Sequence, residues 1–263
     1  MNNTIITIDN FSFSIKNNVI LEDVSLKVNE GDYLSIIGPN GVGKTTLLKC
    51  LIRIFTGGKG TINLAGKSLN SYTQRELAKL ISYVPQSDGR SLDFTVNEFV
   101  MMGRYPYFSP FSSVSKEDRE AVSEALASTE TEHLADRYLN TLSGGERQIV
   151  FIAAAIAQGS RIFLLDEPTT FLDPRHQSDI HKILKRVNSE YGITIVSVTH
   201  DINNAILLSN HIIVLKEGTV AFSGAPSEVM CNKVLERIYE KTFLFVNHPV
   251  TGQPVIIPEG IQP

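Results

Sequence analysis

The sequence predicts an α/β fold with a mainly parallel sheet at its core. One observation is the apolar strand Tyr33–Ile37, which runs through a glycine-rich turn into the apolar segment Leu47–Ile54. Another is Ile162–Leu165, because strands this apolar are typical of the interior of parallel sheets. The third is the alternation of predicted strands and helices beyond residue 142. Together they favour a sheet flanked by helices.

The N-terminal half begins with short strands and turns. Residues 4–37 contain turns at Asn17-Asn18 and Glu30-Gly31, which predicts a β-rich lobe. The next predicted elements are a helix at Leu47–Ile54, a strand at Gly60–Gly66, a helix at Gln74–Leu80 and a strand at Ile81–Val84. Ser115 then starts a helix as its N-cap, with Asp118 as the capping-box partner.

The C-terminal half alternates in the same way. Its predicted elements are a helix at Ile149–Ala157, a strand at Ile162–Leu165, a helix at His176–Asn188, a strand at Ile193–Thr199, a hairpin at Ile212–Leu215 and Thr219–Phe222, and a helix at Pro226–Glu240. Gly192 fits a helix terminator. At 263 residues, with no internal repeat, one large domain with an inserted subdomain is expected.

The composition excludes several classes of protein. A net charge of −4 and a pI of about 5.9 give no sign of a nucleic-acid-binding surface. Cys50 and Cys231 are far apart in sequence, which suits a reducing compartment rather than a metal site. The N-terminus does not read as a signal peptide, and no apolar run approaches the ~18–20 residues of a membrane span. If the protein works in transport, another chain must supply the membrane path.

The run Gly38–Thr46 matches the pattern G-x-x-x-x-G-K-[ST] of a phosphate-binding loop. Glycines let the backbone N–H groups close around phosphates, and the following helix N-terminus adds partial positive charge. Lys44 is expected to reach the β- and γ-phosphates, and the Thr45 hydroxyl to ligate Mg²⁺. The expected nucleotide contacts in this loop are Pro39, Asn40, Gly41, Gly43, Lys44, Thr45 and Thr46. A chance glycine turn is disfavoured by the strand and helix on either side.

A second anion-binding turn is predicted at Leu142–Gln148. Ser143, followed by Gly144 and Gly145 at a helix start, suits an anion, although an ordinary N-cap fits this pattern equally well. The strand Ile162–Leu165 then leads to Asp166 and Glu167. Asp166 is predicted to hold Mg²⁺ through water, and Glu167 to be the general base for an attacking water. The alternative is that the two acids cap the next helix.

In this order the motifs resemble those of the ATP-binding subunits of ABC transporters, over nearly the whole chain. The set is Gly38–Thr46, Gln86, Leu142–Gln148 (the signature), Asp166-Glu167, Thr170–Asp173 (the D-loop) and His200. The resemblance implies one P-loop NTPase domain over residues 1–263. It implies a RecA-like, mainly parallel core, an antiparallel β lobe, a helical subdomain inserted at about 88–160 and a tail at about 242–263.

The resemblance also implies how the site works. Mg²⁺ and ATP are bound between two copies, with Ser143, Gly144 and Gly145 of one copy closing over the γ-phosphate held by the other. Gln86 ligates Mg²⁺ or water and reports the nucleotide state to a membrane partner. His200 holds the γ-phosphate and Asp173 contacts the opposite copy. The alternatives are a structural histidine at a strand end and an N-cap before Pro174.

Two positions depart from the family pattern. Ile15 stands where an aromatic residue usually stacks on adenine, so either Ile15 gives only an apolar contact or Phe13 substitutes from nearby. Stacking is worth roughly 1–3 kcal/mol. Glu146 replaces the commoner glutamine of the signature, from which no loss of function is expected.

Four segments resemble importers of iron–siderophore complexes, haem and cobalamin. They are 94–107, with 116–121 following it, 168–177 and 248–258. An iron(III)-siderophore importer is the first choice, and a haem or cobalamin importer the alternative. The subunit would sit on the cytoplasmic face of the membrane, with integral-membrane permease subunits as partners and a substrate-binding protein acting indirectly.

An aromatic cluster follows Gln86, and it has two interpretations. Its members are Phe94, Phe99, Tyr105, Tyr107, Phe108 and Phe111, with Pro106 and Pro110. They either form the core of the helical subdomain or line a groove for a short helix of the permease. Both can hold if some rings are buried and others exposed.

Other classes of ABC protein fit less well. A translation factor would carry two cassettes, and a repair ATPase a long coiled coil, for which the segment between Gln86 and Ser143 is too short and lacks heptads. A non-hydrolytic scaffold conflicts with the presence of Lys44, Asp166, Glu167 and His200. An exporter subunit is a closer rival, but the segments at 94–107 and 248–258 favour import.

Overall fold

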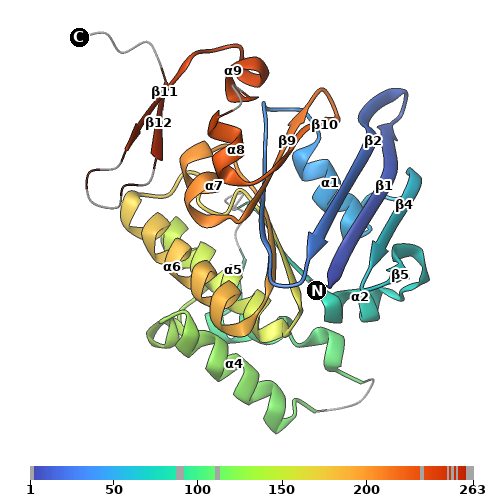
Figure 1. Ribbon diagram of the computed structural model, residues 1–263. Coiled ribbons are helices and arrows are strands. Elements are labelled where there is room, and N and C mark those ends of the chain that lie inside the picture. The colour runs from blue at the N-terminus through green and yellow to red at the C-terminus, as the bar shows by residue number, and fades with distance from the viewer. Residues whose placement is uncertain are drawn as a thin grey trace. The chain divides into compact units, whose positions relative to one another are not determined.

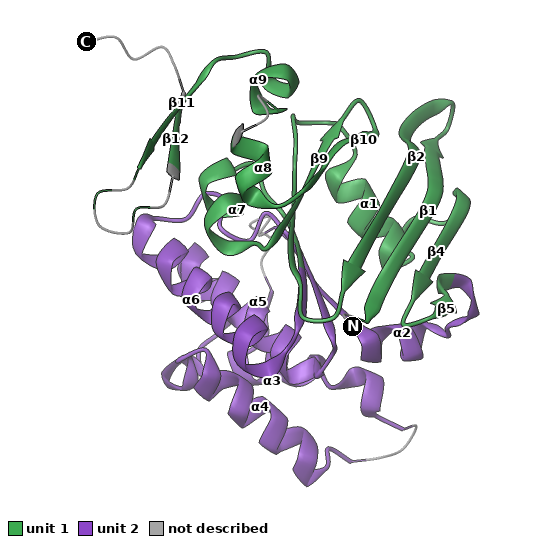
Figure 2. Cartoon of the chain, in the orientation of Figure 1, with its two compact units in different colours: residues 1–69, 196–263 green, residues 70–195 purple. Residues whose placement is uncertain are grey.

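The computed structural model describes residues 3–86, 92–109, 113–231, 234–247, 249, 252 and 254–258. The chain divides into two compact units (Figure 2). Unit 1 contains Met1–Leu69 and Val196–Pro263, and unit 2 contains Asn70–Ile195. Unit 2 is therefore inserted into the sequence of unit 1. Within the described ranges, no helix has the length and apolar character needed to cross a membrane.

Unit 1 begins with the antiparallel lobe that the sequence predicts. The strands β1 (Thr4–Ile15), β2 (Asn18–Asn29), β4 (Lys59–Leu64) and β5 (Lys67–Ser68) form one sheet in the order β2-β1-β4-β5 (Figure 1). All the pairings in it are antiparallel. The strands β1 and β2 are each longer than expected, at 12 residues. Their buried side chains include Ile6, Ile8 and Leu21, so one face of the lobe packs into the interior.

The other strands of unit 1 carry the parallel pairing. Strand β3 (Tyr33–Ile37) is buried at every position and runs parallel to β9 (His211–Lys216). Strand β10 (Thr219–Gly224) completes the predicted hairpin with β9. Strand β8 (Thr194–Val198) spans the boundary between the units. Helices α1 (Lys44–Leu51) and α7 (Ile202–Leu208) also belong to unit 1.

Helix α1 differs at both ends from the expected Leu47–Ile54. It starts at Lys44, because Gly43 adopts a left-handed conformation (φ 100°) and ends the preceding loop there. It ends at Leu51, and two residues later Arg53 has a φ of 59° that no α-helix continues through. The lysine and both threonines of the phosphate loop therefore lie in the first turn of the helix.

The end of unit 1 corrects the expectation of one helix over Pro226–Glu240. The structure has α8 (Pro226–Cys231) and α9 (Val234–Tyr239), with residues 232 and 233 outside the described part. Glu240 has a φ of 55°, which stops α9 before it. Strands β11 (Phe243–Asn247) and β12 (Pro254–Pro258) then form an antiparallel hairpin. Phe243 and Ile256 are buried in a cluster with Ile206, so the tail packs on its own unit.

Unit 2 contains a second parallel strand pair and most of the long helices. Strands β6 (Ile81–Val84) and β7 (Ile162–Asp166) pair in parallel. Its helices are α2 (Gln74–Leu80), α3 (Val96–Met102), α4 (Lys116–Ser128), α5 (Gly144–Gln158) and α6 (Pro174–Tyr191). The capping box of Ser115 and Asp118 is confirmed at α4, and Gly192 ends α6 in a left-handed conformation (φ 66°) as predicted.

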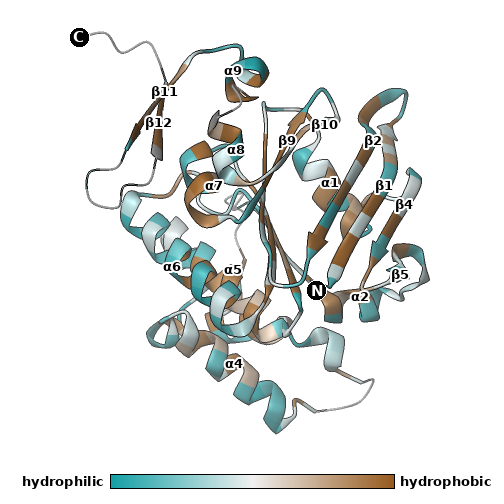
Figure 3. Cartoon of the chain, in the orientation of Figure 1, coloured by the Kyte–Doolittle hydropathy of each residue, from teal (hydrophilic) through white to brown (hydrophobic). Residues whose placement is uncertain are grey.

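Helices α3, α4 and α5 share a buried cluster that includes Val96, Val122 and Val150. Helix α6 buries one stripe, Ile180, Ile183, Leu184 and Val187, and turns its polar side outward. Figure 3 shows the teal and brown faces of these helices. This packing leaves the N-terminal turns of α5 and α6 free to carry functional residues.

The aromatic cluster divides between the two interpretations. Phe99 stacks on Phe151, with ring centroids 5.0 Å apart, whereas Tyr105 is 77% exposed and Phe94 is also exposed. Arg104 is mostly buried; it packs over the Tyr107 ring and makes an ion pair of 3.0 Å with Asp118. Pro110 and Phe111 lie outside the described residues.

Candidate functional site

The phosphate loop of unit 1 lies between β3 and α1, as the sequence predicts. Gly38 has a φ of 147°, and a Cβ built on it would lie 2.2 Å from the carbonyl oxygen of Leu215 in β9. Gly43 is also crowded, because its Cβ would lie 2.8 Å from the carbonyl oxygen of Ile20. No residue with a side chain fits at either position without moving backbone. The pattern of glycines is thus required by the packing of the loop.

Lys44 lies inside the curve of this loop. Its side chain is buried, and Nζ donates to the carbonyl oxygens of Gly38 and Pro39 at 2.8 Å each. The ammonium group is therefore held next to the backbone that would surround a phosphate. A positive charge in that position favours an anionic ligand.

His200 follows β8, in the same unit as the phosphate loop. The Thr199 N–H donates to the Ile36 carbonyl oxygen at 3.2 Å, which places the end of β8 beside the end of β3. Asp201 caps α7 by accepting from the Asn204 N–H. The His200 side chain is exposed. His200 and the loop therefore emerge at the carboxyl ends of neighbouring strands, where ligands bind in α/β sheets.

Phe13 and Ile15, the two residues considered for the adenine contact, have different surroundings. Phe13 is buried and stacks on Phe55, with centroids 5.6 Å apart and planes 15° from parallel. One face of the Phe13 ring is therefore already in contact with another ring, which disfavours Phe13 as the replacement for the missing aromatic residue. Ile15 is 40% exposed at the end of β1 and is available for an apolar contact.

Asp166, the last residue of β7 in unit 2, and Glu167, which follows it, have different surroundings. Asp166 is buried and accepts a hydrogen bond of 3.0 Å from the Tyr83 hydroxyl. Burial, together with the nearby Asp166 charge, raises the pKa of Tyr83 well above its usual range, so the hydroxyl stays protonated. Glu167 has a φ of 49°, an unusual backbone conformation for this residue type.

Glu167 is held by two side chains from different segments. Its Oε2 accepts from Gln86 Nε2 at 3.3 Å and from the Thr170 hydroxyl at 3.0 Å. Gln86 directs its amide nitrogen to this contact, so its amide oxygen is the group left for a metal or water. The sequence placed Gln86 and Glu167 in one site, and the fold brings them together across 81 residues.

The signature turn starts α5 with a capping box. Ser143 accepts from the Glu146 N–H at 3.2 Å, and Glu146 accepts from the Ser143 N–H at 2.8 Å. These hydrogen bonds lower the pKa of Glu146, and the positive charge of Arg137 acts in the same direction. The Glu146 carboxylate therefore fills the capping role that a glutamine side chain can also fill.

The D-loop leads into α6, which Asp173 caps. Asp173 accepts from the backbone N–H groups of Arg175 and His176, so the N-cap interpretation of this residue is confirmed. Gln177 Nε2 donates to the carbonyl oxygens of Thr169 and Leu172, at 3.3 and 3.1 Å. This bonding fixes the loop against the first turn of its own helix.

The sequence reasoning assigned no role to Phe171, within the D-loop, or to His176, which follows the D-loop in α6. Phe171 is 91% exposed and has a φ of 63°, which is strained for a bulky side chain. His176 packs against the signature turn. Phe171 could not be distinguished from a core aromatic by sequence. His176 stands three residues after an N-cap Asp, which was a weak signal for a local ion pair.

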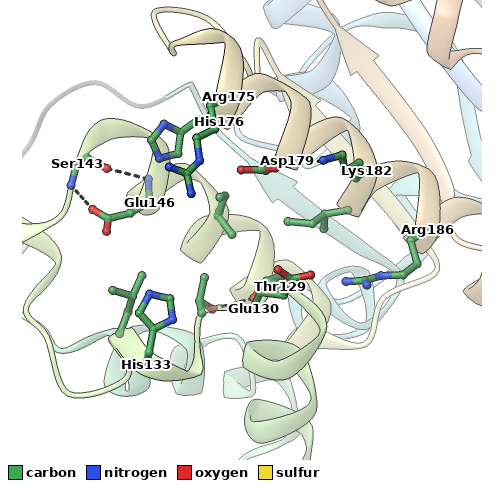
Figure 4. A pocket seen from close by; sticks show the side chains of 14 residues that line it. Thr129, Glu130, His133, Ser143, Glu146, Arg175, His176, Asp179, Lys182 and Arg186 are labelled. Carbon is green, nitrogen blue, oxygen red and sulfur yellow. Dashed lines mark hydrogen bonds and ion pairs between the residues drawn. The ribbon is translucent and has the colours of Figure 1, made fainter.

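A cavity of about 700 Å³ opens beside the signature turn in unit 2 (Figure 4). Ser143 and Glu146 of α5 and Arg175, His176 and Asp179 of α6 lie around it. Across the described part of the chain, no group of three or more His, Cys, Asp or Glu side chains could by itself hold a metal ion. A metal ion bound by the described residues would therefore need oxygen ligands from hydroxyl, amide and phosphate groups, which Mg²⁺ accepts.

Comparison with known families agrees with this arrangement. The family model described as "ABC transporter" matches residues 21–170, more than half of the chain and all of the motifs from the phosphate loop to the D-loop's first residue. The chain belongs to the ABC transporter family. It carries the ATP-binding cassette of that family and is an ATPase.

Two relatives cover nearly the whole cassette. The ferric enterobactin transport ATP-binding protein FepC of Escherichia coli is 41% identical over 92% of this chain and 89% of its own length. The iron(3+)-hydroxamate import ATP-binding protein FhuC of Bacillus subtilis is 40% identical over 91% of this chain and 89% of its own.

Solved structures share the fold. The first is an inward-facing ABC transporter assigned to the metal-chelate type, 26% identical, with a TM-score of 0.86 over 98% of this chain and 99% of that one. Another is a dimeric ATP-binding cassette in a post-hydrolysis state with ADP and phosphate. It is 32% identical, with a TM-score of 0.72 over 84% of this chain and 98% of that one. These matches confirm the P-loop NTPase fold.

Proposed function

We propose that this chain hydrolyses Mg-ATP to drive an ABC importer of iron(III)-siderophore complexes. The observation that carries the proposal is the 41% and 40% identity, over nine-tenths of the chain, to ATP-binding subunits named for ferric enterobactin and iron-hydroxamate transport. Residues 1–263 act in it as one ATP-binding domain, with a helical subdomain at about 88–160. Haem or cobalamin import remains the second candidate, on the segments quoted from the sequence alone.

The phosphate loop would bind the nucleotide. Lys44 pairs with the β- and γ-phosphates, and the backbone N–H groups of residues 40–46 point to the phosphate oxygens. Its position between two loop carbonyls supports this role. Thr45, Asp166 and Gln86 supply the oxygen ligands for Mg²⁺, which would neutralise charge on the phosphates. Ile15 gives the adenine an apolar contact in place of aromatic stacking.

Glu167 would take a proton from the attacking water. The support is its contact with Gln86 and Thr170, which fixes the direction of the carboxylate. A general base must be oriented before its pKa matters. His200 would hold the γ-phosphate from the end of β8, and Ser143 with Gly144 and Gly145 would close over it from a second copy.

A second copy of the chain is the proposed partner in hydrolysis. Phe171 supports this, since a strained, almost fully exposed aromatic ring is a costly surface feature unless a partner covers it. In the Glu167→Gln background with Mg-ATP, Phe171→Ala should weaken dimerisation at least about tenfold. The matched control is Tyr191→Ala, which removes another exposed ring, 61% exposed at the end of α6. Equal dimerisation constants for the two variants would contradict the role of Phe171.

A permease helix is the proposed partner on another face of unit 2. A cavity of about 280 Å³ is lined by Tyr83, Leu92, Phe99, Phe151 and neighbouring residues. An apolar cavity lined by aromatic rings suits an amphipathic helix. The proposal places the protein at the cytoplasmic side of the membrane through this contact, with a substrate-binding protein acting through the permease.

The deciding experiment measures uptake of labelled ferric siderophore, haem and cobalamin in cells that lack redundant systems. Cells carrying Lys44→Ala should lose ferric-siderophore uptake, whereas Lys116→Ala, which changes an 81% exposed lysine, should retain it. Loss of haem or cobalamin uptake instead would replace the substrate and keep the mechanism. If uptake of all three continued, the importer assignment would be wrong and only the ATPase activity would stand.

A further inference from the structure

The signature turn makes one tight contact with the D-loop segment, by which we mean the D-loop and the first turn of α6 (residues 170–177). A Cβ built on Gly145 would lie 2.2 Å from Cγ and 2.7 Å from Cβ of His176. Real Cβ atoms do not approach other atoms so closely, so the imidazole occupies the place that a side chain at position 145 would need. A Cβ on Gly144 would meet Leu172 at 3.8 Å, an ordinary contact. The turn therefore contacts two residues of the D-loop segment, Leu172 and His176, and only the contact with His176 is tight.

His176 is itself fixed by Asp173. Its Nδ1 lies 2.5 Å from Asp173 Oδ2, and because a carboxylate oxygen accepts, Nδ1 carries the proton. The other oxygen of Asp173 accepts from the backbone N–H groups of Arg175 and His176. An N-cap needs only these backbone contacts, so the bond to the ring is an additional one. It holds the pKa of Asp173 below its usual range.

The surroundings of the His176 ring link it to both the signature turn and the D-loop. The Ser143 hydrogen bonds are the main cause of the lowered pKa of Glu146, and Arg137 and His176 lower it further. On the other side, Gln177 and Thr170 tie the D-loop to α6 and to Glu167. Figure 4 shows His176 between Arg175 and the capping box of Ser143 and Glu146. The side chain of His176 thus lies between the signature turn and the D-loop segment, which is bonded to the general base Glu167.

We propose that His176 is a positioning residue that fixes the signature turn, and with it Ser143, against the D-loop segment of the same copy. The inference rests on the proposed function, because it assigns His176 to the closing of the signature over ATP. A ring that is 25% exposed and bonded to one carboxylate can set this distance without touching the nucleotide. Displacements of about 1 Å in such supporting contacts can cost about a hundredfold in rate.

The test is a double-mutant cycle on Mg-ATP hydrolysis by the full-length protein. Gly145→Ala should lower kcat about a hundredfold, because its Cβ displaces the ring. His176→Ala should lower kcat about tenfold and leave ATP binding at the phosphate loop unchanged. In the His176→Ala background, Gly145→Ala should cost at least about tenfold less than in the wild type, because the space is then available.

An equal cost of Gly145→Ala in both backgrounds would overturn the proposal, because the added methyl group would then act on something other than His176. His176→Asn keeps a donor close to the position of Nδ1 and should retain more activity than His176→Ala. His133→Ala, which removes the other histidine of the same cavity, is the matched control and should keep the wild-type kcat. Thermal unfolding of each variant verifies that it is folded.

The two levels of the argument fail differently. If the wild-type protein hydrolyses no Mg-ATP, the proposed function fails. If the wild type hydrolyses ATP and the cycle is additive, or if His176→Ala has the wild-type kcat, only the positioning role of His176 fails.

Discussion

The phosphate loop of unit 1 and the signature and D-loop residues of unit 2 are built in opposite ways. The loop is one run of nine residues, and its own lysine bonds to its own carbonyls. In unit 2, Gln86 meets Glu167 across 81 residues of sequence, and His176 meets Gly145 from a different helix. The first site is local in sequence, whereas the second exists only when the unit has folded.

This difference has a consequence for mutations. A change at a nucleotide contact of the loop should weaken nucleotide binding directly, since most residues of the loop are expected to contact the nucleotide. A change in the unit 2 site should leave binding intact and remove a later step. The following predictions separate the two cases.

The largest effect is expected for Glu167→Gln in unit 2. The amide keeps the shape and the hydrogen-bonding capacity of the side chain but is not basic, so ATP hydrolysis should fall by about 10²–10⁴-fold. Mg-ATP should still bind, and the dimer should accumulate. Phosphate release and gel filtration with Mg-ATP measure both. Glu120→Gln, at a surface ion pair on α4, is the control, and full activity of Glu167→Gln would remove Glu167 from the role of general base.

Lys44→Ala should instead remove nucleotide binding. Losing one charge-assisted contact to phosphate corresponds to roughly 2–3 kcal/mol, or about 30- to 150-fold in Kd. Titration with ATP by calorimetry measures the change. Because Lys116→Ala removes an exposed lysine from the same chain, it shows how much of the loss comes from net charge alone. Unchanged ATP affinity in Lys44→Ala would refute the phosphate role.

Unit 2 should also depend on the ion pair of Arg104 and Asp118. Both side chains are mostly buried, at 12% and 7% exposure, so Arg104→Ala should cost about 3 kcal/mol of unfolding free energy. Lys116→Ala breaks an exposed pair on α4 and should change little. Denaturant unfolding at pH 7 compares them. Similar midpoints for the two variants would contradict the structural role of Arg104.

The same pair gives a pH dependence. Burial acts to raise the pKa of Asp118, but hydrogen bonds from Arg104 and Ser115 outweigh it and hold the pKa below its usual range. A depressed carboxylate pKa stabilises the fold above the unfolded value of about 3.9 and loses this contribution as the pH falls through the folded value. The difference in stability between the wild type and Asp118→Asn should therefore shrink from pH 7 to pH 3. A constant difference would exclude this linkage.

The smallest effect is expected on the unfolding free energy when two glycines of the phosphate loop are replaced. Gly41 has a φ of 80° with nothing within 4 Å of an added Cβ, so Gly41→Ala should cost only the ~1–2 kcal/mol of a left-handed residue. Gly43→Ala should cost more, because its Cβ would also lie 2.7 Å from the Leu21 side chain. Unfolding free energies of both variants measure this, and equal losses would show that packing adds nothing at Gly43.

The sequence by itself determined the contiguous features of this protein. It predicted the α/β class, the strand β3, the phosphate loop, the capping box of Ser115 and Asp118, and the glycine that ends α6. Each depends on neighbouring residues, because hydrogen bonds at helix ends and left-handed turns are satisfied within a few positions. The ordered motifs were specific enough to indicate the family before any contact was known.

Only the tertiary structure decided which side chains share a contact. It showed Phe13 buried and stacked on Phe55, and it divided the predicted helix over Pro226–Glu240 in two. It also placed His176 against Gly145 and left Phe171 exposed. The physical reason is that burial and steric contact depend on packing between segments far apart in the chain, which residue type and local spacing do not specify.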